Sequence, residues 1–220
     1  MQVLSQSLAK AQLQPCAIPC LELTAVKKRL AWQELANSAE FEHYHSMAPV
    51  GHGGLVRTRI TPIETGCLLY CQIVSRCGKE YSPWVYLNIY DVVVLSMCYC
   101  AGVVSIFFIK SNRRIECLTS SDGGSNWGSA TLIDYSPTTD INGISVTCKP
   151  NGDMGLFFAD QDILYVKHRV NGIWQPRTAW VLSTNSLSGV SAIWNGDWAL
   201  VVTGKDASNN YCLWRTGLGD

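Results

Sequence analysis

Charged residues are scarce in this sequence, and neither sign is in excess. Only 15% of the 220 residues are charged, and 17 Lys and Arg balance 17 Asp and Glu. Chains that bind nucleic acid usually carry a basic stripe, and solvating tails carry runs of acidic residues. The sequence has neither feature, so we expect no nucleic-acid partner.

We also expect no secretory signal in the first twenty residues. Residues 1–14 have no continuous apolar core, and Lys10 is their only charge. The most apolar stretch, residues 92–109, is close in length to a membrane span, but it is rich in Val, Ile and Phe and is broken at Gly102. We therefore predict two buried strands joined by a tight turn there, and no membrane span.

The ten cysteines lack the Cys-x2-Cys spacing of a structural zinc site. Cys67 and Cys71 are four positions apart and Cys98 and Cys100 are two apart, which suits packing on one face of a strand. A chain of this length does not need covalent staples, so we expect free buried thiols and no cofactor. A disulfide framework stays open if the protein works outside a cell.

The sequence does contain a repeat of strands. Residues 151–156 (Asn-Gly-Asp-Met-Gly-Leu) recur as 195–200 (Asn-Gly-Asp-Trp-Ala-Leu). The predicted strands form four groups: 55–61, 67–74 and 83–87; 92–100, 103–110, 114–119 and 127–133; 144–149, 154–159, 163–170 and 174–180; and 190–194, 198–203 and 211–216. A period of about 40–50 residues with four strands in each unit is typical of β-propeller blades. We predict an all-β propeller of about four four-stranded blades over residues 55–220.

The N-terminal part is predicted to differ from the repeats. Residues 1–19 are expected to form an arm or a short helix, and residues 20–54 two strands followed by a loop over 37–54. The last blade lacks a fourth strand, which leaves an unpaired edge. Either the segment 29–36 closes this blade, or the chain is truncated and its remaining blades are missing. In the second case the ring is incomplete, or another chain completes it.

One motif interrupts the second repeat, Ser120-x-Asp122-x-Gly124-x-x-Trp127. We expect a short turn in which the Ser and Asp side chains bond backbone groups, glycine adopts angles that other residues resist, and Trp127 packs over the turn as it opens the next strand. The motif resembles the Asp-box of sialidase-like β-propellers. That resemblance implies a structural role at the periphery of a blade, away from any catalytic face.

The resemblance also raises the question of catalysis. Sialidases carry an Arg-Ile-Pro segment. A partial match to it is Arg59-Ile60-Thr61-Pro62, in which Thr61 is inserted before the proline. Arg59 would then be the matching arginine, because a guanidinium binds a carboxylate through two parallel hydrogen bonds. No acid and no Tyr-Glu pair can be assigned. We therefore predict that the chain is not an enzyme, with a sialidase-like glycoside hydrolase as the alternative.

Two further groups of residues are candidate sites. His43, His45 and His52 form the only histidine cluster, and they are candidate metal ligands if a loop brings them together. Trp194, Trp198 and Trp214 lie outside the fourth-strand pattern. These three rings would either stack on sugars or pack between blades.

We predict a non-catalytic recognition module that binds a glycan or another macromolecule through one propeller face. The run of residues 4–12, followed by a strand and a propeller, looks like phage tail-associated proteins. This resemblance implies a virion or particle-associated location, with the cytoplasm as the alternative. A third possibility is an assembly protein that forms homo-oligomers through the incomplete last blade.

Overall fold

The structure is a computed structural model that describes residues 43–50, 54–64, 66–75, 81–138, 141–181, 184–206 and 208–218. These residues form strands and no helix, and so include no helical membrane span. The strands are β1 (His43–Pro49), β2 (Leu55–Ile63), β3 (Gly66–Val74), β4 (Val85–Tyr90), β5 (Val92–Cys100), β6 (Val103–Lys110), β7 (Arg114–Ser120), β8 (Thr131–Tyr135), β9 (Ile141–Cys148), β10 (Met154–Asp160), β11 (Ile163–Val170), β12 (Ile173–Trp174), β13 (Thr178–Val181), β14 (Thr184–Trp194), β15 (Trp198–Asp206) and β16 (Tyr211–Leu218).

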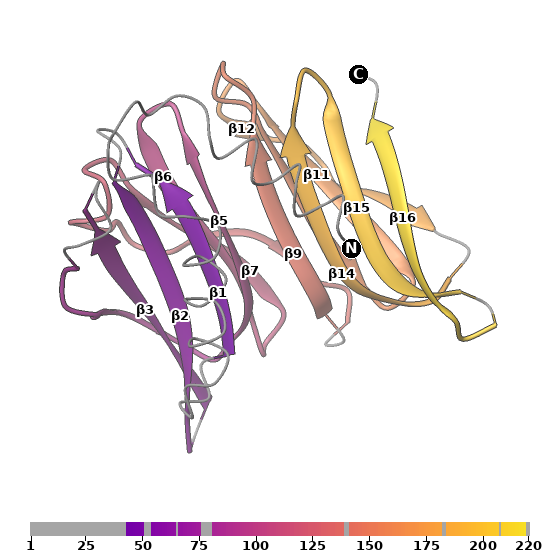
Figure 1. Cartoon of the computed structure of the whole chain (residues 1–220), viewed down its shortest axis with the longest axis horizontal. Helices are drawn as coiled ribbons and strands as arrows, with labels where there is room; N and C mark the ends of the chain where they lie inside the picture. Colours follow the sequence, from indigo (N-terminus) through magenta and orange to yellow (C-terminus); the bar gives the residue numbers. More distant parts are fainter. Residues whose placement is uncertain are drawn as a thin grey trace, which may run out of the picture. The chain divides into compact units, whose positions relative to one another are not determined.

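The strands form four antiparallel sheets of consecutive strands (Figure 1). The first sheet is β1–β4, the second β5–β8, the third β9–β13, in which β12 and β13 both pair with β11, and the fourth β14–β16. The first strands of successive sheets contact one another, β1 with β5, β5 with β9 and β9 with β14. This is the arrangement of propeller blades, and it confirms the predicted fold of about four blades.

Each predicted strand over 55–220 overlaps a strand of these sheets, although 174–180 is divided into β12 and β13 and the strand predicted at 127–133 begins at Thr131. The loop prediction for 37–54 is wrong at His43–Pro49, which forms β1 and pairs with β2. Among residues 46–49, whose side-chain exposure is described, only Ala48 is buried, at 1% exposure, so burial leaves little pattern in this part of the strand. Its place is set by partners distant in sequence, since the Ser46 hydroxyl accepts a hydrogen bond from Met97 N at 3.1 Å. The remainder of residues 1–54, apart from 50 and 54, lies outside the described residues.

The apolar stretch 92–109 forms the hairpin β5–β6, as predicted. Strand β6 is buried on both sides because sheets cover both of its faces. Phe108 packs in the core between the first and second sheets, and its neighbour Phe107 packs between the second and third. Strand β10 repeats the arrangement with Phe158 and Phe157, which face the second and fourth sheets.

The outermost sheets differ from these central ones. In β2 the buried residues Val56, Thr58 and Ile60 alternate with the partly exposed Arg57 and Arg59. Strand β15 alternates in the same way over residues 198–205. An alternating pattern follows when neighbouring elements cover only one face of a sheet.

The turn after β7 has the hydrogen bonds that its sequence predicts. Gly124 N donates to Ser120 Oγ at 2.8 Å, Asn126 N donates to Asp122 Oδ1 at 2.9 Å, and Trp127 Nε1 donates to Gly124 O at 3.0 Å. Gly124 has a φ of 94°, which favours glycine. One detail of the prediction is wrong, because Trp127 precedes the next strand, which begins at Thr131.

The Asp122 carboxylate gives this turn a pH dependence. Hydrogen bonds from the backbone and side chain of Asn126, and then from Ser120, lower the pKa of Asp122 from 3.8 to about 2. Because the pKa is lower in the folded protein, this stabilisation is present above pH 3.8 and is lost as the pH falls through about 2. We expect Asp122→Asn to flatten the fall in melting temperature between pH 4 and pH 2, measured by circular dichroism. An unchanged fall would contradict this role.

Candidate functional site

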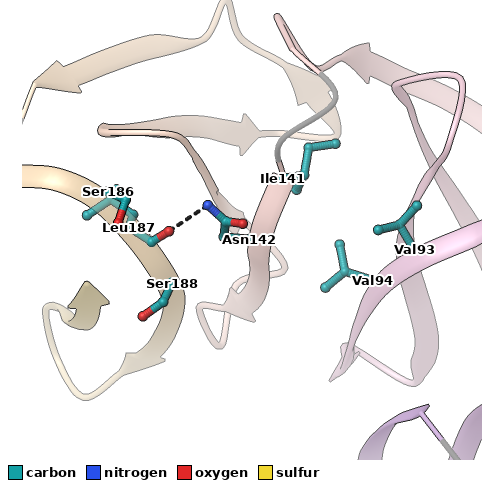
Figure 2. Close-up of a pocket in the computed structure, with 7 residues that line it drawn as sticks. All are labelled: Val93, Val94, Ile141, Asn142, Ser186, Leu187 and Ser188. Atoms are coloured by element: carbon teal, nitrogen blue, oxygen red, sulfur yellow. Dashed lines mark hydrogen bonds between the residues drawn. The ribbon is translucent and has the colours of Figure 1, made fainter. Parts of the chain in front are cut away.

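A cavity of about 450 Å³ lies at the starts of β5, β9 and β14. Its lining residues are Val93, Val94, Ile141, Asn142, Ser186, Leu187 and Ser188. Figure 2 shows Val93 and Val94 on one side, the segment 186–188 on the other, and Asn142 between them. The first strands of three successive sheets therefore build one site.

This cavity lies at the end of the sheets opposite to the turn that carries Asp122. Val92, at the start of β5, pairs with Lys110 at the end of β6. Ser120, where that turn begins, pairs with Val104 at the start of β6. The motif at 120–127 is therefore remote from the cavity, as its predicted structural role requires.

Backbone and side-chain hydrogen bonds fix the shape of the cavity. The Asn142 side-chain amide donates to Leu187 O at 2.6 Å, as the dashed line in Figure 2 marks. Leu187 N donates to Gln161 O at 2.5 Å. Strand β14 is thus tied both to β9 and to the turn after β10 at the wall of the site.

The chemistry of the lining is neutral. The side chains of Asn142, Ser186 and Ser188 offer amide and hydroxyl groups, and the other four lining residues are aliphatic. None of the seven carries an ionisable side chain. Such a surface can exchange hydrogen bonds with hydroxyl groups and pack against C–H surfaces.

A buried carboxylate at this end of the third sheet has a structural use. Asp160 is 2% exposed, and its oxygens accept hydrogen bonds from Ser136 Oγ at 2.7 Å, from Thr138 N at 3.0 Å and from Thr138 Oγ1. These bonds tie the connection between β8 and β9 to β10. A carboxylate engaged in this way holds the chain rather than a substrate.

Arg59 does not line the cavity. It lies in β2, with its guanidinium 4.4 Å from the centre of the Trp84 ring and 5.4 Å from that of Tyr70. Arg57 lies beside it, 5.0 Å from the Trp84 ring, and donates from Nε to Gln72 Oε1 at 2.7 Å. The two arginines thus form a cation–π cluster with aromatic residues of the first sheet. The sialidase-like role of Arg59 stays a prediction.

Two of the three candidate tryptophans meet. Trp194 and Trp198 face each other across the β14–β15 pair, with ring centres 4.8 Å apart. Trp198 is only 3% exposed and packs in the core of the third and fourth sheets, whereas Trp194 is partly exposed, with Lys149 Nζ 4.6 Å from its ring. The backbone of Trp214 lies in β16, opposite Val202. Ligand binding by these three residues stays a prediction.

The histidine candidates are only partly described. His43 and His45 lie in β1, where the pairing with β2 shifts register between them, and His52 lies outside the described residues. In the part of the chain that the structure describes, no group of three His, Cys, Asp or Glu residues is placed to hold a metal ion.

The cavity residues themselves were missed by the sequence interpretation. Asn142-Gly143 and Ser186-Leu187-Ser188-Gly189 look like ordinary turn segments at the beginning of a repeat. A usable signal was nevertheless present, because Val93, Asn142 and Leu187 stand near the start of the first strand in three successive repeats. Aligning the repeats by their first strands would have brought them together.

Comparison with solved structures identifies the fold. A fungal lectin from Aleuria aurantia, a six-bladed β-propeller with a fucose recognition mode, matches with a TM-score of 0.57 at 10% identity, over 78% of this chain and 57% of the lectin. The catalytic domain of the Coprinopsis cinerea GH62 α-L-arabinofuranosidase matches with a TM-score of 0.55 at 12% identity, over 81% of this chain and 66% of that domain. The endosialidase of phage phi92 matches with a TM-score of 0.54 at 9% identity, over 80% of this chain and 35% of the endosialidase.

These similarities establish the fold and leave the function to be argued from the site. The chain spans little more than half the length of the lectin. No family model matches the sequence, and no curated protein matches it. The chain is therefore a β-propeller that corresponds to part of larger propellers.

Proposed function

We propose that this chain is a carbohydrate-recognition module that binds a neutral saccharide in the cavity at the starts of β5, β9 and β14. The observation that carries the proposal is the described lining of that cavity, whose seven residues combine amide and hydroxyl groups with aliphatic side chains and carry no ionisable side chain. Neutral sugars present hydroxyl groups and C–H faces and carry no charge. A volume of about 450 Å³ lies within the range of small-molecule sites, roughly 300–1,000 Å³.

The same lining argues against the hydrolase alternative. Glycoside hydrolysis generally needs two carboxyl groups on either side of the scissile bond. The described lining residues have none, Asp160 is held by Ser136 and Thr138, and Arg59 contacts aromatic rings of the first sheet. These placements support a binding role over a catalytic one.

The turn at 120–127 and the edge of the fourth sheet bear on the relatives of this chain and on its assembly. The hydrogen bonds of the turn at 120–127 support kinship with Asp-box propellers. The fourth sheet has three described strands, and β16 lies at its edge. Addition of a fourth strand at this edge, by residues 29–36 or by another copy of the chain, stays a prediction. A particle-associated location also stays a prediction.

The function is tested by a glycan array probed with the full chain, followed by incubation of each bound glycan with the protein. We expect neutral saccharides among the bound glycans, recovered intact. Release of a shorter sugar or a monosaccharide would favour the hydrolase. Binding confined to anionic glycans would contradict the neutral site.

Asn142 is the side chain to vary in this cavity. We expect Asn142→Ala to weaken binding of a neutral array hit by about tenfold, because an amide that both shapes the wall and meets the ligand is lost. Titration calorimetry measures the change. Asn151→Ala is the matched control, since Asn151 lies in the β9–β10 turn at the other end of the sheet, where it donates to Asp153. Equal affinities for the Asn142 variant and the control would argue against this site.

A further inference from the structure

A second cavity, of about 270 Å³, lies between the second and third sheets. Residues of β6, β7 and β8 line one side, and residues of β10, the end of β11 and β12 line the other. It shares no lining residue with the first cavity. The two cavities therefore have separate linings.

One wall pairs a cation with an aromatic ring. Arg169 of β11 lies directly opposite Trp174 of β12 and Met154 of β10, so the three side chains form a row on one face of the sheet. Arg169 Nε donates to Gly172 O at 3.2 Å, which orients the guanidinium. The Trp174 ring meets Phe107 edge-on, with ring centres 5.7 Å apart.

The facing wall carries hydroxyl groups. Ser105 of β6 lies opposite Thr119 of β7, and Cys117 of β7 lies opposite Thr131 of β8. Thr119 and Thr131 are exposed, so their hydroxyl groups are accessible from solvent. Two facing sheets thus present an arginine and an indole on one side and hydroxyl groups on the other.

Arg169 brings a positive charge to the lining of this cavity. None of the described residues that line it carries a carboxylate, and Arg169 forms no ion pair with the described acidic side chains. The Asp153 carboxylate accepts hydrogen bonds from Asn171 N and Asn151 Nδ2, each at 2.9 Å, and these bonds lower its pKa. The charge of Arg169 contributes to the same lowering of the pKa. Burial raises the pKa of Cys117 to about 12, so this thiol is neutral at physiological pH.

We propose that this second cavity binds one acidic sugar residue of the hexuronic acid class. Its carboxylate would lie on the Arg169 guanidinium, its C–H face on Trp174 and its hydroxyl groups near Thr119 and Thr131. Arginine suits a planar carboxylate because two N–H groups can donate in parallel. A volume below the usual range for drug-sized ligands, about 300–1,000 Å³, fits a single sugar ring rather than an oligosaccharide.

The test compares methyl glucuronide with methyl glucoside, which differ only in the carboxylate, by saturation-transfer NMR and titration on the full chain carrying Asn142→Ala, which is expected to weaken binding of the neutral glucoside in the first cavity. We expect the glucuronide to bind about tenfold or more tightly than the glucoside, and Arg169→Gln to abolish that preference. Arg113→Gln is the matched control, because Arg113 is exposed and lies in the turn between β6 and β7. The control should keep the preference.

Equal affinity for the two glycosides, no binding of either, or a preference that survives Arg169→Gln would each overturn the proposal. If Arg169→Gln does not fold, Thr131→Val tests the same cavity from an exposed position, with an expected loss of roughly fivefold. Asn142→Ala should leave glucuronide binding unchanged. The second site can therefore fail without the first, and the first without the second.

Discussion

Replacing Phe157 by alanine is expected to lower the free energy of unfolding by about 3–5 kcal/mol. The Phe157 ring is fully buried in the core between the third and fourth sheets. It meets Trp198 at a centre-to-centre distance of 6.0 Å and His168 at 6.5 Å. Truncation leaves a cavity where two sheets meet, and the fixed backbone of both sheets limits its collapse.

Urea unfolding followed by circular dichroism measures this loss. Phe157→Leu should cost less, because most of the buried volume is kept. Val85→Ala is the exposed control, since Val85 is 51% exposed, and it should change the free energy by no more than about 0.5 kcal/mol. A loss below about 1 kcal/mol for Phe157→Ala would mean that the third and fourth sheets do not share this core.

Gly204→Ala is expected to have the second large effect. A Cβ at Gly204 would lie 2.3 Å from Ser186 O and 3.0 Å from Leu187 Cα, both of which are backbone atoms. Strand β14 must then move away from β15 at residues 186 and 187, and both of these residues line the first cavity. We expect a loss of about 1–3 kcal/mol in unfolding free energy, together with loss of neutral-saccharide binding.

Gly128→Ala is the control for this substitution. A Cβ there would lie 3.7 Å from Thr119 O, which is ordinary van der Waals contact, so stability and saccharide binding should both be retained. Unfolding and calorimetry on the two variants separate the effects. Wild-type stability for Gly204→Ala would show that β14 and β15 are further apart than the structure has them.

Strands such as β2, β6 and β10 could be predicted because their own side chains are buried in a regular pattern. The apolar run of β6 and the Phe-Phe pairs of β6 and β10 arise because sheets cover both faces. In β2 the alternation arises because only one face packs on a core. Burial leaves its pattern in the sequence in both cases.

Strand β1 could not be predicted in the same way. Its sequence, HYHSMAP, shows no sustained alternation, and it is held by pairing with β2 and by the bond between Ser46 and Met97. These partners come later in the chain. The turn at 120–127 is the opposite case, because its bonds join residues within four positions of one another.

The candidate site was missed for a similar physical reason, although an alignment of the repeats by their first strands would have grouped its residues. Val94, Asn142 and Leu187 are brought together only when three repeats stack through their first strands. The rare residues attracted more attention, yet Trp198 is buried in a core and Arg59 stacks on aromatic rings. Residue type alone does not show which tryptophan or arginine remains available to a ligand.

The most direct test of the neutral-saccharide site is to fill it. Val93 is 36% exposed and lines the cavity, so Val93→Trp should occupy the site from its solvent side without disturbing a core. Calorimetry with a neutral array hit should show binding lost in Val93→Trp and retained in Val85→Trp, which adds the same side chain to the first sheet. Undiminished binding by a folded Val93→Trp variant would contradict the proposed site.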